Sequence, residues 1–381
     1  MKNKQRVFII AGEASGDVLG ARLMDSLRYF TGDRLEFVGI GGVKMAEQGM
    51  RSLFPMRDIA LMGFVEVLPH AWRVLCRIKE TCDALAANPP DVIITIDSPG
   101  FNFRVLEWVR RYFGTSIPCI HYVAPTVWAY KQERAKRTAE LCDHLLTLLP
   151  FEPRYFEVYG LKTTFVGHPV VDQLGNDCAP ILPLALGTPL HLTVFPGSRR
   201  GEIQHLLPIF RDSITQLSNH YPDMHVSMIV HPMVADVIDV SDFCCPVRLV
   251  QHEDERAEVM RTTHLALTKT GTVTLEIATY GVPMVAAYHV HPLTAYMVRH
   301  LIRIPYVNLI NIMARAYVIP ELIQEQCNPT HLANAMHALL KHPQARQEQA
   351  DRAITALHQL RNPQGILASD AAAQCILPYL A

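Results

Sequence analysis

Asp97 stands where a parallel sheet would present a catalytic carboxylate. It directly follows the apolar run 92–96 and precedes Ser98-Pro99-Gly100, which enforces a turn. In open α/β sheets, ligands bind beyond the carboxyl ends of the strands, so we expect this side chain beside a bound ligand. It could act as the general base that accepts a proton from a hydroxyl nucleophile. The alternative is that Asp97 only stabilises its own turn, and the residues leave the two interpretations even.

A second polar turn, Pro196-Gly197-Ser198-Arg199, follows the apolar run 192–195. An arginine offers a planar pair of N–H donors that suits a diphosphate, and the backbone N–H groups of a turn before a helix add to it. This pattern favours an anion contact at Ser198 and Arg199. The alternative is a surface arginine beside a tight turn.

A third polar turn runs through Thr270, Gly271 and Thr272, with Glu276 in the helix that follows. The hydroxyl and N–H groups of this turn could hold a phosphate, and the carboxylate of Glu276 could bind the two hydroxyls of a ribose. A Gly-Thr turn is a weak signal. A capped helix with a favourable acidic residue in its first turn is the alternative.

Histidines do not form a recognisable metal site. His289-x-His291 would lie on one face of a strand, but no carboxylate or cysteine nearby completes a ligand set, so we predict no metal. His121 and His168 lie at strand ends and could approach a ligand. Histidines in such positions are more often hydrogen-bonded structural residues.

The elements that must position these turns repeat along the chain. Apolar runs alternate with segments of helical period such as 20–30 and 103–113, which predicts parallel strands with crossover helices. A stretch rich in Pro, Gly, Asn and Asp, 171–189, predicts a linker. The strand-like runs lie at 7–11, 35–40, 92–96, 119–123, 145–149, 163–166, 192–195, 225–230, 247–250, 265–268 and 284–287.

We therefore predict an α/β protein of two Rossmann-like, doubly wound domains, residues 1–170 and 190–343, that face a cleft. A helical tail, 344–381, is expected to pack back on the first domain. The first domain opens with the turn Gly12-Glu13-Ala14-Ser15-Gly16-Asp17. Like the turn at Gly197, it contains glycine and lies between a predicted strand and a predicted helix. Two such turns suggest a transferase that uses a nucleotide-activated donor.

Composition excludes several other classes. The 381 residues contain 35 basic and 36 acidic side chains, and this near-neutral balance argues against a nucleic-acid partner. Nine cysteines without a C-x-x-C pair indicate reduced thiols. No apolar run is long enough for a signal segment or a spanning helix, so we expect a cytoplasmic protein with at most peripheral membrane contact.

One amphipathic segment has two interpretations. Apolar residues near a helical period are interleaved with Arg73, Arg77 and Lys79, which is typical of a surface that dips into a bilayer or of an ordinary core-facing helix. From the residues alone, the core-facing helix is favoured. The apolar positions are Leu61, Phe64, Val65, Leu68, Trp72, Leu75 and Ile78.

Eight motifs in register resemble those of the lipid-A-disaccharide synthases, over nearly the whole chain. Any one of them would be weak, but their order and spacing together are specific. They are Gly12-Glu13-Ala14-Ser15-Gly16-Asp17, Met62-Gly63-Phe64-Val65-Glu66-Val67-Leu68, Asp97-Ser98-Pro99-Gly100-Phe101-Asn102, His121-Tyr122-Val123-Ala124-Pro125-Thr126-Val127-Trp128-Ala129, Leu149-Pro150-Phe151-Glu152, Val166-Gly167-His168-Pro169, Pro196-Gly197-Ser198-Arg199 and Gly271-Thr272-Val273-Thr274-Leu275-Glu276.

The resemblance implies a GT-B fold and an inverting glycosyltransferase of lipopolysaccharide synthesis in a Gram-negative bacterium. Such an enzyme moves 2,3-diacylglucosamine from UDP to the 6-hydroxyl of 2,3-diacylglucosamine 1-phosphate, giving the β-1,6 disaccharide. It also implies that no metal or other cofactor takes part. Asp97 matches the family's essential aspartate, the base on the acceptor hydroxyl. Arg199 matches its essential arginine, on the diphosphate or the acceptor phosphate.

Further residues are assigned by the same resemblance. Glu13 and Ser15 match a loop on the acceptor side, and Asn311 matches an asparagine near the donor. Substrate contacts are also expected at Asn102, Ser198, Thr270, Gly271, Thr272 and Glu276. Because both substrates carry acyl chains, the resemblance favours the membrane interpretation of the amphipathic segment. Contact with the inner-membrane surface is then expected through Phe64, Val65, Leu68, Trp72 and Leu75. The resemblance also implies that a homodimer can form in which the helical tail, 344–381, is exchanged between protomers.

Two rival functions stay open at this point. The first is another two-domain UDP-sugar enzyme, either a transferase that makes a lipid-linked cell-wall intermediate or a hydrolysing UDP-N-acetylglucosamine epimerase, which needs no lipid surface. A non-catalytic, peripheral lipid-binding protein could keep the fold as a scaffold. The presence of both Asp97 and Arg199 weakens the second rival.

Overall fold

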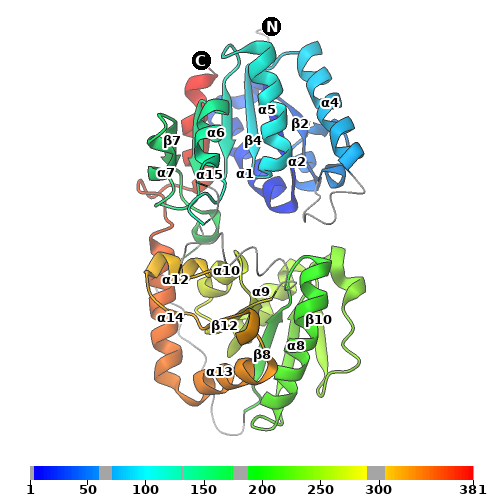
Figure 1. The fold of residues 1–381 in the computed structure, drawn as a ribbon, viewed down its shortest axis with the longest axis vertical. Helices are drawn as coiled ribbons and strands as arrows, with labels where there is room; N and C mark the ends of the chain where they lie inside the picture. Colours follow the sequence, from blue (N-terminus) through cyan, green and yellow to red (C-terminus); the bar gives the residue numbers. More distant parts are fainter. Residues whose placement is uncertain are drawn as a thin grey trace. The chain divides into compact units, whose positions relative to one another are not determined.

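The structure is a computed structural model that describes residues 4–59, 71–129, 132–172, 174, 188–289 and 305–380. The chain divides into two compact units. Unit 1 comprises Met1–Asp172 together with Leu360–Ala381, and unit 2 comprises Gln173–Gln359. Each unit is built on its own sheet with helices on both faces (Figure 1).

Unit 1 contains a seven-stranded parallel sheet with the order β3-β2-β1-β4-β5-β6-β7. The strands are β1 (Gln5–Ala11), β2 (Leu35–Ile40), β3 (Arg51–Ser52), β4 (Val92–Ile96), β5 (Cys119–Tyr122), β6 (His144–Thr147) and β7 (Lys162–Phe165). The helices are α1 (Ala14–Thr31), α2 (Val43–Glu47), α4 (Ala71–Ala87), α5 (Pro99–Phe113), α6 (Arg134–Leu141), α7 (Arg154–Glu157) and α15 (Ala368–Ile376). The strand order reverses between β1 and β4, as in a doubly wound fold.

Unit 2 repeats this design with six parallel strands in the order β10-β9-β8-β11-β12-β13. The strands are β8 (His191–Phe195), β9 (His225–Ile229), β10 (Val247–Val250), β11 (Leu265–Lys269), β12 (Met284–Tyr288) and β13 (Glu321–Ile323). The helices are α8 (Arg200–Ser218), α9 (Glu253–Thr262), α10 (Val273–Thr279), α12 (Leu309–Ala314), α13 (Pro329–Lys341) and α14 (Pro343–His358). Here the order reverses between β8 and β11.

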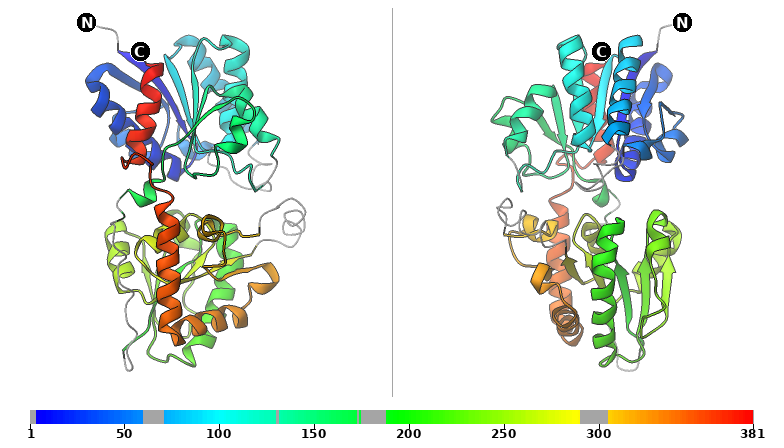
Figure 2. Two further views of the ribbon diagram at one scale, coloured as in Figure 1. Left: turned by 90° about the vertical axis from the view of Figure 1, so that its left-hand side faces the viewer. Right: turned by 45° about the vertical axis from the view of Figure 1, so that its right-hand side comes forward.

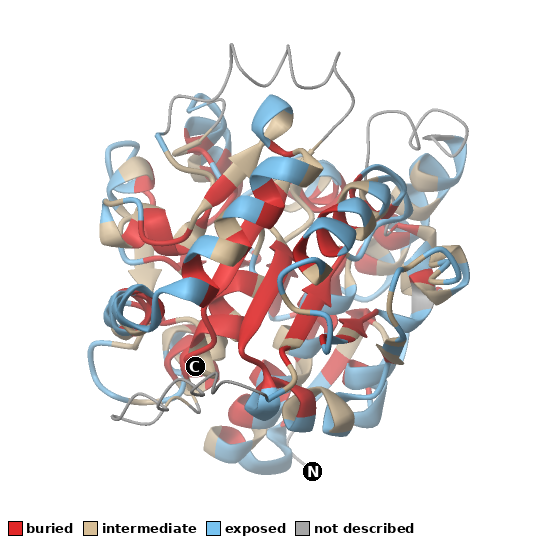
Figure 3. Ribbon diagram, turned by 90° about the horizontal axis from the view of Figure 1, so that it is seen from below, coloured by how far each residue is buried: buried red, intermediate tan, exposed pale blue. Residues whose placement is uncertain are grey.

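The fold class is thus confirmed, and the apolar runs explain it. Successive residues of a strand point to opposite faces, so Val7 and Ile9 of β1 enter the core formed with α1 and α15, while Phe8 and Ile10 enter the core formed with α5. In Figure 3 the central strands are almost wholly buried, and the helices are buried mainly on their inward sides, whereas strands such as β3 and β7 contain no buried residue. Strands β3 and β13, which have two and three residues, were not predicted from the sequence.

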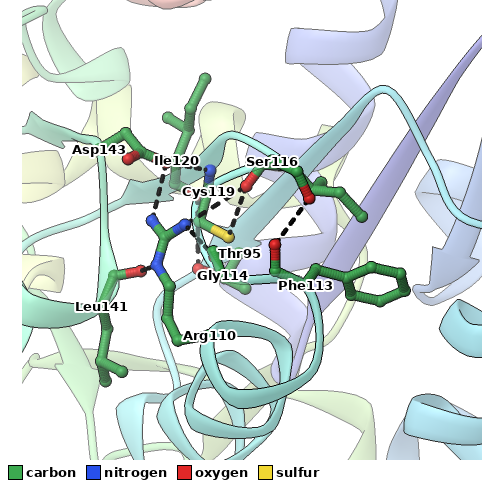
Figure 4. A network of polar contacts seen from close by, with 10 residues as sticks. Thr95, Arg110, Phe113, Gly114, Ser116, Cys119, Ile120, Leu141 and Asp143 are labelled. Atoms are coloured by element: carbon green, nitrogen blue, oxygen red, sulfur yellow. Dashed lines mark hydrogen bonds and ion pairs between the residues drawn. The ribbon is translucent and has the colours of Figure 1, made fainter.

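The amino-terminal edge of the unit 1 sheet is closed by a polar network around Arg110, on α5 (Figure 4). Its guanidinium donates to the backbone oxygens of Leu141 and Gly114, at 3.0 and 3.2 Å, and pairs with Asp143 at 2.7 Å. The Asp143 carboxylate also accepts the N–H of Cys119, the first residue of β5. These contacts lie at the strand starts, opposite the edge where the candidate site forms.

The expected tail, 344–381, is divided between the units. Helix α14 packs against α10 and α12 in unit 2, whereas α15 packs against α1 in unit 1 (Figure 2). The returning segment is tied down by backbone contacts. The N–H of His168 donates to the oxygen of Leu360 at 2.9 Å, and the side-chain amide of Asn362 donates to the oxygen of Val166 at 3.1 Å. In this chain the last helix therefore completes the core of its own unit.

Candidate active site

Two polar turns of unit 1 meet where the strand order reverses. Because β1 pairs with β4 and Ala11 lies opposite Ile96, the residues that follow these strands leave the sheet side by side. Glu13 is the N-cap of α1 and is half-buried, whereas Ser15 is exposed in the first turn of that helix. The structure therefore brings Glu13 and Ser15 to the same edge of the sheet as the turn at Asp97.

The turn at Asp97 has an unusual backbone. Asp97 and Ser98 have φ angles of +49° and +44°, in the left-handed region that residues other than glycine rarely adopt. Such conformations cost on the order of 1–3 kcal/mol each and persist only where the surroundings hold them. One such contact is the N–H of Asp97, which donates to the oxygen of Tyr122 at 2.9 Å. The Asp97 side chain itself is half-buried.

Asn102 holds this turn from beneath. Its side chain is fully buried, and its amide nitrogen donates to the backbone oxygens of Ile96 at 3.2 Å and Asp97 at 2.6 Å. We expected Asn102 to contact substrate directly. In this structure the amide nitrogen holds the turn, while Oδ1 has no hydrogen-bond partner among the described residues, so the direct contact stays a prediction.

His121 and His168 are structural in this fold. His121 is fully buried, and its Nδ1 lies 2.7 Å from Thr95 Oγ1, with the Phe103 ring packed edge-on at 5.0 Å. Burial lowers the pKa of His121 to about 3, so this imidazole stays neutral at physiological pH. Burial likewise lowers the pKa of His168 to about 4, and its Nδ1 accepts the N–H of Val170.

Unit 2 also places two polar turns where its strand order reverses. Strand β8 pairs with β11, and Phe195 lies opposite Thr268. After β8, Gly197 has a φ of +119° and Arg199 is the N-cap of the 19-residue helix α8. Ser198 and Arg199 are exposed, and the Arg199 side chain is 52% exposed. The anion contact expected at these residues thus has an accessible cation at a helix start.

The turn after β11 divides its residues between surface and interior. Thr272 is exposed and Gly271 is half-buried, but Thr270 is 4% exposed and its N–H donates to the oxygen of Ala287 at 2.8 Å. The Thr270 hydroxyl has no hydrogen-bond partner within the part of the chain that the structure describes. The hydroxyl of Thr274 donates to the oxygen of Gly271 at 2.7 Å, which closes the first turn of α10.

Glu276 is paired with an arginine that the sequence analysis missed. Its carboxylate accepts a hydrogen bond from Arg256, on α9, whose guanidinium lies 5.6 Å from the centre of the Phe195 ring. Burial raises the pKa of Glu276, and the charge of Arg256 opposes that rise. The sequence gives no signal for this contact, because Arg256 and Glu276 lie 20 residues apart and no local pattern links them.

Asn311 is also a structural residue. It is fully buried on α12, its oxygen accepts the N–H groups of Val318 and Ile319, and its nitrogen donates to the oxygen of Ile319. These distances are 2.8–2.9 Å. Its side chain holds residues 318 and 319, and the donor contact expected of Asn311 stays a prediction.

Two residues of the proposed membrane surface can be located. On α4, Trp72 is 78% exposed and Leu75 is 49% exposed, so neither belongs to the core. Leu75 also lines a groove of about 430 Å³ between α4 and α5, together with Trp108 and other residues. Phe64, Val65 and Leu68 lie outside the described residues. Within the described residues, no helix is long and apolar enough to cross a membrane.

No group of three or more His, Cys, Asp or Glu side chains suited to a metal ion occurs in the described ranges. His289 lies 6.0 Å from His205, ring centre to ring centre, while His291 lies outside the described residues.

Solved structures share this architecture. Over 99% of both chains, the chain superposes on a UDP-N-acetylglucosamine 2-epimerase from Neisseria meningitidis bound to UDP-N-acetylglucosamine, with a TM-score of 0.62 and 13% identity. A kitacinnamycin glycotransferase gives a TM-score of 0.62 with 16% identity over the full length of both chains. At these identities the likeness shows the fold alone.

Sequence relatives define the family. The lipid-A-disaccharide synthase of Rhodospirillum centenum is 46% identical over 356 residues, covering 91% of this chain and 87% of the relative. That of Gluconobacter oxydans is 41% identical over 376 residues, covering 97% of this chain and 89% of the relative. A sequence model of the family described as lipid-A-disaccharide synthetase matches residues 7–376. The chain therefore belongs to the lipid-A-disaccharide synthetase family of hexosyltransferases.

Proposed function

We propose that this protein transfers 2,3-diacylglucosamine from UDP to the 6-hydroxyl of 2,3-diacylglucosamine 1-phosphate, with inversion at the transferred carbon. The family supports the reaction. The observation that carries the assignment to residues is the turn at Asp97. It combines a half-buried carboxylate with two left-handed backbone positions, where the strand order of unit 1 reverses.

In this proposal Asp97 is the general base. The oxygen of the acceptor 6-hydroxyl attacks the anomeric carbon of the donor and forms the new C–O bond, while its proton passes to the Asp97 carboxylate. The bond between the anomeric carbon and the diphosphate breaks, and UDP leaves with the electron pair. Attack opposite the departing group converts the α linkage of the donor to the β-1,6 linkage of the product. Glu13 and Ser15 line the same edge and are assigned to the acceptor.

Unit 2 is assigned to the UDP half of the donor. The exposed guanidinium of Arg199 and the N–H groups at the start of α8 would take the diphosphate, with Ser198, Gly271 and Thr272 beside it. Glu276 is assigned to the ribose hydroxyls. Positive charge from Arg199 and backbone dipoles would stabilise the developing negative charge on UDP, so the proposal includes no metal or other cofactor.

The decisive experiment supplies UDP-2,3-diacylglucosamine and 2,3-diacylglucosamine 1-phosphate and measures disaccharide and UDP together. We expect Asp97→Asn and Arg199→Ala each to reduce kcat/KM by at least about 100-fold, as for loss of a base or of an electrostatic stabiliser. Exposed Arg248, remote from the turns in sequence, supplies the control variant Arg248→Ala. Consumption of UDP-N-acetylglucosamine without an acylated acceptor would instead support an epimerase, and vesicle binding without UDP release would support a non-catalytic lipid-binding protein.

We also propose that α4 lies against the cytoplasmic surface of the inner membrane. Exposed Trp72 and Leu75 would enter the bilayer interface together with Phe64, Val65 and Leu68. The variant Trp72→Ser/Leu75→Ser should reduce binding to anionic vesicles at least several-fold and leave the melting temperature within a few degrees, because both side chains are exposed. Unfolding of this variant would show that the two residues stabilise the fold instead.

A homodimer is a further part of the proposal. Residues 360–380 pack on their own unit 1 here, and exchange of this segment between two protomers would preserve the same contacts. Light scattering of the purified protein at several concentrations tests this, since a monomer at all concentrations contradicts it.

A further inference from the structure

Lys269 and Glu202 form a shielded ion pair in unit 2 that the assigned residues do not include. Lys269 ends β11, in the interior of the sheet, and Glu202 lies in the first turn of α8. Lys269 Nζ lies 3.0 Å from Glu202 Oε1, and the two side chains are 18% and 11% exposed. The same carboxylate oxygen lies 3.4 Å from a guanidinium nitrogen of Arg199. One carboxylate oxygen therefore contacts two cations.

This arrangement is poorly explained as a stabilising ion pair alone. Removing two charges from water costs about as much as their attraction returns, unless further hydrogen bonds satisfy both groups. Glu202 Oε2 has no hydrogen-bond partner among the described residues. The Lys269 ammonium carries three N–H donors, and its Nζ also lies 5.6 Å from the centre of the Tyr288 ring. The N–H donors of the Lys269 ammonium are thus suited to an additional anion.

Two glycines bring the backbone close to the pair. A Cβ on Gly271 would lie 3.6 Å from Lys269 Nζ, so the ammonium lies against the backbone of the turn that follows β11. A Cβ on Gly197 would lie 3.2 Å from Glu202 Oε2, so the turn that follows β8 also passes close to the pair. Lys269 therefore lies between the two turns that flank the strand-order reversal of unit 2, where a doubly wound sheet binds its ligand.

We propose that Lys269 is a second cation for the diphosphate of the nucleotide donor, beside Arg199, and that Glu202 holds its ammonium toward the two turns. This inference rests on the proposed function of the same unit. As the bond to the sugar breaks, negative charge grows on the departing diphosphate. An ammonium already held in a partly desolvated position stabilises that charge more than a solvated surface lysine does.

The test compares the binding of UDP and uridine to the purified, full-length protein by isothermal titration calorimetry. Lys269→Met keeps the length of the side chain and removes its charge. We expect this variant to bind UDP about 10- to 100-fold more weakly, the range for loss of a charge-assisted hydrogen bond. Its affinity for uridine should be unchanged. Lys269→Arg should retain UDP binding within a few-fold. Exposed Lys341, at the end of α13, supplies the matched control Lys341→Met, with no expected change.

A second variant separates binding from folding. Lys269→Met leaves the Glu202 carboxylate without its nearest cation, which alone can destabilise unit 2. Lys269→Met/Glu202→Gln removes both charges, and we expect it to fold and still to bind UDP at least 10-fold more weakly than the native protein, by the same estimate. Unchanged UDP affinity in the folded double variant overturns the proposal, as does an equal loss of uridine binding.

The outcomes also separate this inference from the proposed reaction. If the native protein binds UDP through Lys269 but makes no disaccharide, the proposed transfer fails and the diphosphate contact stands. If it makes the disaccharide and Lys269→Met binds UDP as tightly as the native protein, only the role of Lys269 fails.

Discussion

Gly12 and Ser98 approach each other so closely that position 12 cannot carry a side chain without a rearrangement. A Cβ built on Gly12 would lie 2.3 Å from Ser98 Oγ and 2.6 Å from Ser98 Cβ, well inside any real contact. This contact joins the turn that follows β1 to the turn that carries Asp97. The backbone of Asp97 and Ser98 is therefore packed against a neighbouring turn as well as held by Asn102.

Replacement of Gly12 by alanine should displace the Asp97 turn. We expect a loss of about 1–3 kcal/mol in the free energy of unfolding, as for other overpacking substitutions, and a drop in transferase kcat larger than the change in KM. Gly100, which has no neighbour within 4 Å of its built Cβ, supplies the control Gly100→Ala. Denaturant unfolding and steady-state kinetics check both variants. Native activity in Gly12→Ala would contradict the inference that the turn after β1 holds the Asp97 turn in position.

Asn102→Ala should act mainly on the position of the base. The substitution removes the two hydrogen bonds to the oxygens of Ile96 and Asp97, and the left-handed turn then loses its support from α5. We expect about 1–2 kcal/mol of destabilisation, the usual range for lost buried hydrogen bonds. We also expect kcat to fall, with donor and acceptor KM changed less than two-fold if Asn102 does not touch substrate.

The control for Asn102 is the exposed Asn88, at the end of α4. Asn88→Ala should change neither stability nor kcat. A large rise in acceptor KM for Asn102→Ala, without an effect on kcat, would return Asn102 to direct substrate binding.

Asp17 should contribute to stability and not directly to catalysis. This 4% exposed carboxylate accepts the backbone N–H groups of Gly42, Lys44 and Met45, at 2.7, 2.9 and 3.0 Å, and so satisfies the start of α2. Asp17→Ala should cost about 1–3 kcal/mol, because it leaves buried donors unpaired. Thermal unfolding measures the loss, with exposed Asp33→Ala as the control. Full stability in Asp17→Ala would contradict the capping role.

Glu152 should make the stability of unit 1 depend on pH. It is 3% exposed, and its carboxylate accepts the indole N–H of Trp128 at 3.2 Å and the N–H of Leu149 at 3.1 Å. Burial raises the pKa of Glu152 to about 7, and these hydrogen bonds limit the rise. The folded state therefore holds its proton more tightly than the unfolded state does. The stabilisation is complete below the unfolded pKa, near 4.5, and is lost as the pH rises through 7.

Glu152→Gln isolates this effect. Relative to the variant, the native protein should lose up to about 3 kcal/mol of unfolding free energy between pH 4.5 and 7.5. The buried His121 has the opposite sign, because its lowered pKa reduces stability as the pH falls below about 6.5, but it is present in both proteins and cancels. Urea unfolding at several pH values measures the difference. Parallel pH profiles for the two proteins would contradict a raised Glu152 pKa.

The sequence predicted most elements of both sheets because their signal is local. Strand β4 is a run of five buried residues, and a buried parallel strand needs no polar alternation, so residue type alone reveals it. Strands β3 and β13 were missed because two or three residues carry no period. The division of the expected tail was missed for another reason. Helices α14 and α15 have similar patterns, and only packing decides that one belongs to unit 2 and the other to unit 1.

The candidate site was predictable in its chemistry but not in its contacts. Asp97 directly follows an apolar strand, Arg199 stands in the turn after another, and Glu276 lies in the helix after a third, at the edge where an α/β sheet presents its ligand contacts. The amides of Asn102 and Asn311 look equally suited to a ligand, yet both are buried against backbone groups. Nothing in the order of residues links Lys269 to Glu202, since the contact depends on β8 and β11 being neighbours.

By itself, the sequence determined the class of fold, the chemistry at the strand ends and, through eight motifs, the family. These properties depend on residue type and on spacing along the chain. The tertiary structure alone decided which turns lie together, which polar side chains are buried, and that Glu202 is shared by Arg199 and Lys269. The physical reason is that burial and ion pairing depend on distances between residues far apart in sequence, and strand order sets those distances.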